Sequence, residues 1–150
     1  TSNQVNVMDS ASNFFMITGV KMELGPSATS LTFRSLQDDL VLCQRYYEKS
    51  YDLGTLAGTA TNTGGQNCVV ASVNDLGATT YYKVTKRTAP TITPYSPATG
   101  TSNAVRNYSS AADVTGVSTE VSDAGFRVYK TASFTAGQFC AYQWTASAEL

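Results

Sequence analysis

One segment of the chain, residues 35–50, is the only stretch whose pattern predicts an α-helix. Ser35 is a favourable N-cap, and Asp38 follows it at the three-residue spacing of a capping box. Arg45 and Lys49 lie near the expected C-terminus, where positive charge complements the helix dipole. The rest of the chain is mostly strand-like. Any arrangement of the strands must therefore be compatible with the surface that covers this helix.

The expected helix carries a wide apolar stripe. The members of the stripe recur at i, i+4, i+7 and i+11, and Val41, Leu42 and Tyr46 widen it over more than half of the circumference. A helix of about 16 residues is marginal in water by itself, so its apolar surface must be covered. It either docks on the sheet of its own domain or associates with further copies of itself. The candidate self-association residues are Leu36, Leu40, Cys43 and Tyr47.

The composition excludes several classes of partner. Charged residues make up only 14% of the 150 residues, against about 25% in typical domains, and the net charge is −1. We expect no nucleic-acid partner, because no basic stripe exists to neutralise phosphates. No apolar run approaches the ~20 residues that span a bilayer, so we expect no membrane insertion, and no signal peptide opens the chain. Since a strand-like run starts almost at Thr1, we expect a fragment of a longer protein.

The three cysteines do not form a disulfide or metal-binding pattern. Cys43, Cys68 and Cys140 are odd in number, widely spaced and set among apolar neighbours, which favours free buried thiols. Their spacing is not that of metal ligands, and the chain has no histidine to complete a site. We therefore expect no metal and no other cofactor.

The residues before the helix have strand-like patterns. Apolar residues alternate along 14–24, a shorter run covers 5–8, and the loop-like residues 9–13 between them make a hairpin plausible. An isolated hairpin is marginal in water. Residues 1–34 are therefore interpreted either as an N-terminal hairpin or as the closing strands of an upstream β domain.

The residues after the helix predict a β-sandwich. Residues 51–65 read as a connector, and the strand candidates that follow are separated by turn signals, such as those at 74–77, 96–100 and 122–125. The candidates are 67–73, 80–86, 91–95, 104–108, 114–121, 125–130 and 138–148. The predicted fold class is all-β: an antiparallel, jelly-roll-like β-sandwich over 51–150, preceded by a strand or hairpin and one short α-helix.

Four segments resemble the C-terminal regions of bacteriophage tail fibres and tailspikes. Residues 15–25 (FMITGVKMELG) resemble an "ITGVQLE-G" strand that closes a carbohydrate-binding jelly roll in that family, and residues 39–49 (DLVLCQRYYEK) resemble the "L-L-CQRYY-K" helix that follows it. Residues 88–97 (TAPTITPYSP) and the WTASAEL ending at 144–150 resemble the later segments. The chain departs from the family in Lys21 and in the Lys86-Arg87 pair, and residues 51–86 match only loosely.

The resemblance implies an assembly and a place of action. It implies a homotrimer whose helix stripe meets two copies of itself at a three-fold axis. It also implies a receptor-binding fibre tip that contacts a host cell-surface polysaccharide or lipopolysaccharide. Such a protein is made in the bacterial cytoplasm and is exposed outside the host cell as part of the virion tail.

The usual catalytic groups are missing from the sequence. There is no imidazole base, and the three thiols lie in patterns typical of inert packing. Glycoside cleavage needs two carboxylates about 5–10 Å apart. The carboxylates available for it fall mostly in turns, where aspartate is common for local hydrogen bonding. They are Asp52, Asp75, Asp113, Glu120 and Asp123. We therefore expect no enzyme.

Sugar recognition needs an aromatic face and hydrogen-bonding side chains, which the nine tyrosines combine. Strand alternation places five candidates on the face opposite the core: Tyr95, Arg106, Tyr108, Arg127 and Tyr129. In a trimer, that face is alternatively buried against a neighbouring subunit. Trp144 shares its parity with Cys140 and Tyr142, so we expect it in the core, where its indole N–H needs a partner.

Three functional hypotheses follow. The first is a phage tail fibre or tailspike module that trimerises and presents a glycan-binding tip. The second is a purely structural trimerisation cap, with binding or depolymerase activity in an upstream domain. The third is an enzyme that cleaves glycans, for which the sequence offers the least support.

Overall fold

The computed structural model describes residues 14, 16–71, 75–131 and 133–149. The chain divides into two compact units, Thr1–Arg34 and Ser35–Leu150. The described residues of the first unit form neither helix nor strand, so the strand predicted over 14–24 is wrong for them. Gly19 adopts a φ of 69°, which interrupts an extended backbone. The described residues of this unit also have no neighbouring strand with which they could form ladder hydrogen bonds. The predicted strand at 5–8 lies outside the described residues.

The second unit begins with the helix α1, Leu36–Gln44. The predicted N-cap forms, because the Ser35 hydroxyl oxygen accepts a hydrogen bond from the Asp38 N–H at 3.1 Å and donates one to the Asp38 carboxylate at 2.7 Å. The helix ends at Gln44 and not at residue 50, so Arg45 is its C-cap and Lys49 lies beyond it. Tyr47 therefore belongs to a strand, β1 (Tyr47–Lys49), which pairs with the last strand of the chain.

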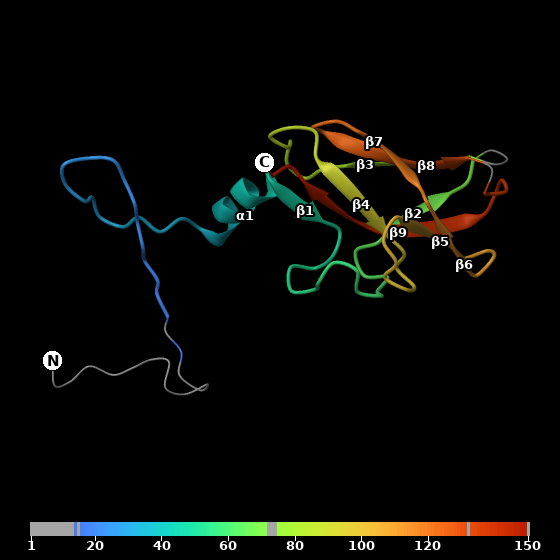
Figure 1. Ribbon diagram of the computed structural model, residues 1–150, viewed down its shortest axis with the longest axis horizontal. Helices are drawn as coiled ribbons and strands as arrows, with labels where there is room; N and C mark the ends of the chain where they lie inside the picture. The colour runs from blue at the N-terminus through green and yellow to red at the C-terminus, as the bar shows by residue number, and fades with distance from the viewer. Residues whose placement is uncertain (1–13, 15, 72–74, 132, 150) are drawn as a thin grey trace. The chain divides into compact units, whose positions relative to one another are not determined.

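The last strand, β9 (Phe139–Ser147), is the centre of the larger sheet, and all of its neighbours are antiparallel to it (Figure 1). On one side it pairs with β1 and β2 (Gln66–Val69). On the other side it pairs with β4 (Thr91–Tyr95) and β5 (Ala104–Asn107), and β6 (Ala112–Thr115) completes the sheet beyond β5. One long strand thus holds together segments from both ends of the second unit.

The smaller sheet contains β3 (Asp75–Tyr81), β8 (Gly125–Thr131) and β7 (Ser118–Val121), in that order and antiparallel. The predicted bounds of β4 are those of the structure, and the predicted bounds of β8 differ by one residue at its end. It was wrong at β3, because 74–77 was interpreted as a turn and the strand was placed at 80–86. In the structure Leu76 and Ala78 are buried in the core and residues 82–86 lie outside the strand, so burial outweighed the turn-forming residues.

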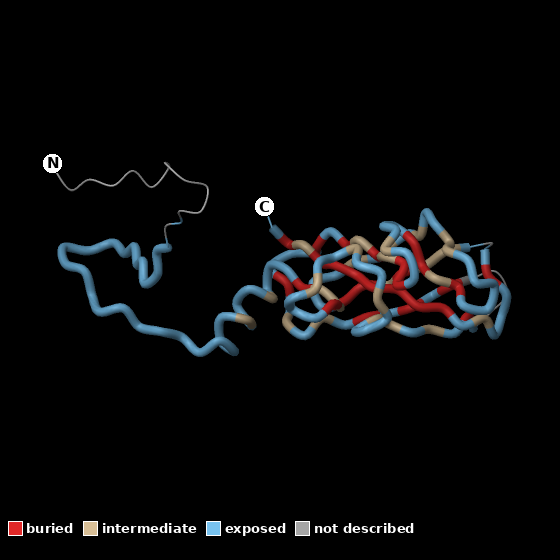
Figure 2. The backbone as a smooth tube through the Cα atoms, turned by 90° about the horizontal axis from the view of Figure 1, so that it is seen from below, coloured by how far each residue is buried: buried red, intermediate tan, exposed pale blue. Residues whose placement is uncertain are grey.

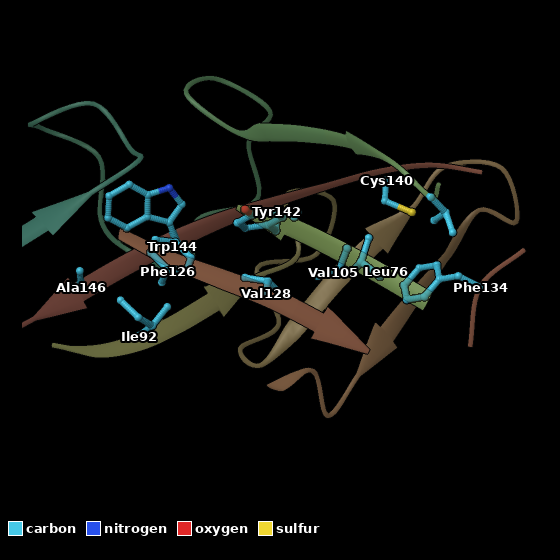
Figure 3. Packing of buried hydrophobic residues seen from close by; sticks show 12 residues of the cluster. Leu76, Ile92, Val105, Phe126, Val128, Phe134, Cys140, Tyr142, Trp144 and Ala146 are labelled. Carbon is cyan, nitrogen blue, oxygen red and sulfur yellow. The ribbon is translucent and has the colours of Figure 1, made fainter. Parts of the chain in front are cut away.

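The two sheets face each other across one hydrophobic core (Figure 3). Trp144 of β9 lies 5.2 Å from Phe126 of β8 in an edge-to-face contact, measured between ring centroids. The Tyr142 and Thr80 hydroxyls hydrogen-bond across the two layers at 2.7 Å, and burial raises the pKa of Tyr142 to about 12. The predicted core position of Trp144 is confirmed, since its side chain is only 3% exposed. The all-β prediction is likewise confirmed.

The opposite face of β9 is also covered. Gln143 is fully buried, although it alternates with the core residues. Its amide nitrogen donates to the carbonyls of Thr61 and Thr63 at 2.9 and 2.8 Å, and its amide oxygen accepts from the Ser50 hydroxyl. These bonds hold the predicted connector, residues 51–65, against the sheet. Gly64 allows the close approach, because a Cβ at this position would lie 2.2 Å from the Ser50 carbonyl oxygen.

A buried ion pair fixes the end of the helix. The Lys86 ammonium lies 2.5 Å from the Glu48 carboxylate, and both side chains are almost completely inaccessible to solvent. The same ammonium donates to the carbonyl of Gln44, the last helical residue, so Lys86 supplies the positive charge at the helix C-terminus that Arg45 and Lys49 were expected to supply. The Glu48 carboxylate also accepts the Lys83 backbone N–H at 3.1 Å. Helix, β1 and the segment after β3 therefore share one polar junction.

We predict that Lys86→Met lowers the free energy of unfolding by about 3 kcal/mol or more, because Glu48 is left as a buried, unpaired charge. The double variant Lys86→Met/Glu48→Gln recovers most of the loss, since the amide still accepts the Lys83 N–H without carrying charge. Urea unfolding measures both. Lys83→Met, at an exposed position, is the control, and equal stability of the two single lysine variants would contradict the prediction.

Candidate functional site

The helix exposes its apolar surface. None of the nine residues of α1 is buried, and Leu36 and Leu42 are 82% and 48% exposed (Figure 2). Docking of the helix on its own sheet is therefore not observed, and the expectation that Cys43 is buried is wrong for this chain by itself. The helix ends at Gln44 and the chain enters β1 at Tyr47, so the helix is too short for its apolar stripe to lie across the sheet.

Three of the four predicted self-association residues nevertheless lie together. Leu40, Cys43 and Tyr47 line one groove of about 400 Å³, whose other wall includes Tyr51 and Leu53 of the connector. Leu36 is one turn before Leu40 on the helix and does not line this groove. Burial, and secondarily the neighbouring Tyr95 phenol, raises the pKa of Tyr47, so its hydroxyl stays neutral at physiological pH. The lining combines these apolar side chains with polar and charged ones such as Lys49 and Asp52, a mixture that is common in protein contacts.

The predicted ligand residues Arg127 and Tyr129 lie on the outer face of the smaller sheet. Both are half-buried in β8, between fully buried core residues such as Val128. The Arg127 guanidinium carbon lies 5.5 Å from the centre of the Tyr129 ring, and its Nη1 lies 3.4 Å from the Glu120 carboxylate of β7. The pair thus presents a cation, an aromatic face and a carboxylate side by side, groups suited to binding sugar hydroxyls.

The predicted residues Arg106, in β5 of the larger sheet, and Tyr108, directly after that strand, form a similar pair. Their guanidinium carbon and ring centre are 6.0 Å apart, and Arg106 Nη1 also lies 3.2 Å from the Asp113 carboxylate of β6. The Tyr108 hydroxyl donates to the Asn62 side chain of the connector, and its ring lies against Phe139 with the centroids 5.6 Å apart. Tyr108 is therefore partly occupied by contacts within the chain.

The fifth predicted residue, Tyr95, faces the connector. Its ring lies edge-on to Tyr51, with centroids 6.2 Å apart, and beside the backbone of Gly58, whose N–H donates to the Tyr51 hydroxyl at 3.2 Å. The five candidates therefore fall in three places rather than in one site. Sequence alternation indicated which side chains leave the core, but the packing of the connector over one face could not be predicted from it.

Asp113 organises the surface around Arg106. Its carboxylate accepts hydrogen bonds from the Thr99 and Ser96 hydroxyls at 2.5 and 2.8 Å, in addition to Arg106. Burial opposes ionisation of Asp113, but these three donors outweigh it and lower its pKa. Asp113 and Glu120, two of the carboxylates considered for glycoside cleavage, belong to different sheets.

No cluster of three potential metal-ligating side chains occurs among residues 14, 16–71, 75–131 and 133–149. Within the same part of the chain, no helix has the length and apolar character needed to span a membrane. Comparisons of the chain with protein-family models, with curated protein sequences and with solved structures found no match.

We predict that Asp113 stabilises the fold in a pH-dependent way. Its pKa in the folded protein lies below the ordinary 3.8, so its stabilising effect is complete above about pH 4 and is lost as the pH falls through the folded value. Asp113→Asn should lower the free energy of unfolding by about 1–3 kcal/mol at pH 7.

Urea unfolding at pH 7 and at about pH 3 measures this effect, with the exposed Asp123→Asn as the control. We expect the gap between wild type and Asp113→Asn to narrow in acid. A gap that is unchanged at low pH would show that the loss at neutral pH comes from packing and not from the carboxylate.

Proposed function

We propose that this chain is the C-terminal module of a phage tail fibre or tailspike, which trimerises the fibre and presents a tip that binds a host surface glycan. The observation that carries the proposal is the exposed apolar helix. Leu36 is 82% exposed and lies one turn from a groove lined by Leu40, Cys43 and Tyr47, and a contiguous apolar surface of this kind favours contact with another surface. The resemblance of residues 39–49 to the tail-fibre helix supports two further copies of the same helix as that surface.

The polar junction behind the helix supports this arrangement. Lys86 and Glu48 fix the C-terminal end of α1 to the sandwich without covering its apolar side. The Arg87 backbone N–H also donates to the Arg45 carbonyl at 3.1 Å. A helix held at one end and bare along its side is oriented for association, because its position is set before any partner arrives.

The adhesive part of the proposal rests on the outward-facing Arg–Tyr pairs. Arg127 with Tyr129 and Arg106 with Tyr108 each place a cation beside an aromatic ring. In a three-fold assembly each pair is repeated three times, so weak individual contacts with a polysaccharide or lipopolysaccharide combine into strong attachment. We propose binding rather than catalysis, in a virion part that acts outside the host cell after synthesis in the bacterial cytoplasm. We also propose that the strands of the two sheets are connected as in a jelly roll.

The first test is the mass in solution, measured by light scattering at several protein concentrations. We expect three times the chain mass of 16.0 kDa, independent of concentration. Leu40→Asp should abolish the trimer, because it places three carboxylates at the contact. Gln37→Asp, on the same helix but outside the stripe, is the matched control. A monomeric wild type, or a trimer that survives Leu40→Asp, removes the helix from its assigned role.

The second test is binding of the trimer to an array of bacterial surface polysaccharides and lipopolysaccharides. We expect at least one to bind, and we expect monomeric Leu40→Asp to bind it about 100-fold more weakly through loss of multivalency. A correctly folded trimer that binds no glycan would instead support the structural cap, in which an upstream domain binds or depolymerises the receptor.

A further inference from the structure

A hollow lies on the outer face of the smaller sheet, beside the Arg127–Tyr129 pair. Its volume is about 290 Å³, and all three strands of that sheet line it. Thr79 and Tyr81 come from β3, Glu120 from β7 and Arg127 from β8. Tyr81 is not among the binding residues that the sequence predicted.

The strand register places an aromatic ring beside a row of polar side chains. Thr79 and Glu120 are both paired with Arg127, one on each side of β8. Because neighbouring strands are about 4.8 Å apart, these three side chains form a row about 10 Å wide. Tyr81 lies two residues further along β3 and is paired with Gly125. A Cβ at Gly125 would lie 3.2 Å from Cδ1 of the Tyr81 ring, so the glycine lets this ring extend toward β8.

The Arg127 guanidinium is held by all three strands. Its Nη1 lies 3.4 Å from the Glu120 carboxylate of β7, and its carbon lies 5.5 Å from the centre of the Tyr129 ring on β8. On β3, a Cβ at Gly77 would lie 2.7 Å from Nη2, so the guanidinium passes directly over this glycine. A side chain that is positioned before a ligand arrives loses less conformational entropy on binding.

The polar groups of the hollow favour a neutral ligand with adjacent hydroxyls. The charged residues in the lining are one acid, Glu120, and one base, Arg127, so the lining has no net charge that would attract an ion. A carboxylate only accepts hydrogen bonds, and a guanidinium only donates them. Two adjacent hydroxyls of a sugar satisfy both groups, since one donates to Glu120 while the other accepts from Arg127.

Tyr81 supplies the aromatic surface, and its side chain is 77% exposed. The Ser122 hydroxyl also lines the hollow, but it donates to the Gly125 carbonyl and accepts the backbone N–H groups of Ala124 and Gly125. An aromatic face next to hydrogen-bonding groups accommodates both the C–H surface and the hydroxyls of a sugar ring. The volume is close to the lower limit of small-molecule sites, about 300 Å³, which suits a single ring.

We infer that the hollow formed by β3, β8 and β7 binds one neutral sugar residue. Tyr81 lies against the C–H face of the sugar, and Glu120 and Arg127 hydrogen-bond to two adjacent hydroxyls. The inference rests on the proposed glycan-binding function and specifies its site. It places the sugar on the smaller sheet, so the Arg106–Tyr108 pair of the larger sheet is not needed to bind a single sugar.

Titration of the full chain with methyl glycosides, followed by ligand-observed NMR, tests the site. The glycosides are those of glucose, galactose, mannose and N-acetylglucosamine, and at least one should bind. Methyl glucuronide, which carries a carboxylate, should bind no more tightly than methyl glucoside, because Glu120 repels it.

Two variants test the assignment of residues. Tyr81→Ala removes the exposed ring and should weaken binding about tenfold. Glu120→Ala removes the acceptor for a sugar hydroxyl and should weaken binding to a similar extent. Val69→Ala, at an exposed position on β2 of the larger sheet, is the control and should bind as wild type does. The midpoint of urea unfolding checks that all three variants are folded.

Three outcomes overturn the inference. If none of the glycosides binds, the hollow is not a sugar subsite, and the polysaccharide array decides the proposed function separately. If binding survives Tyr81→Ala and Glu120→Ala but is lost in Arg106→Ala, the subsite lies on the larger sheet, and glycan binding stands without this hollow. If methyl glucuronide binds more than tenfold more tightly than methyl glucoside, the site selects anionic sugars and not neutral ones.

Discussion

The buried ion pair between Lys86 and Glu48 joins the helix of the second unit to its β-sheets. Lys86 contacts the last carbonyl of the helix, and Glu48 belongs to the strand that follows the helix and accepts the backbone N–H of Lys83 after β3. Burying two charges is costly unless both are paired and hydrogen-bonded, as they are here. The junction therefore fixes one relative position of helix and sandwich.

This junction explains why the helix is ordered although its apolar side is bare. The Ser35 hydroxyl accepts an N–H at the start of the helix and the Lys86 ammonium donates to its last carbonyl, so both ends are hydrogen-bonded without burial of the helix leucines. In most domains packing of an apolar face stabilises a helix. Here the free face is left for a second surface, and in our proposal that surface is formed by two further copies of the chain.

The candidate binding surfaces differ in how they are built. Arg127, Tyr129 and Arg106 lie on regular strands, where alternation turns side chains outward, and Tyr108 follows directly after β5. A hollow of about 480 Å³ is lined by four strands distant in sequence, β1, β2, β3 and β9, and by the connector that Gln143 holds in place. In our proposal, the outer sheet faces make the repeated contacts along a surface polymer.

The sequence alone determined the local features: the Ser35 cap, the all-β class, the bounds of β4 and β8 and the core parity of Trp144, because each follows from periodicity or from neighbours within a few residues. Tertiary structure decided the rest. The helix ended at Gln44 because β9 offered an edge to Tyr47, and Leu76 entered a strand because the core accepted it. The Lys86–Glu48 pair and the Thr80–Tyr142 hydrogen bond join residues tens of positions apart. Such contacts depend on strand pairing across the whole chain, about which the spacing of nearby residues carries no information.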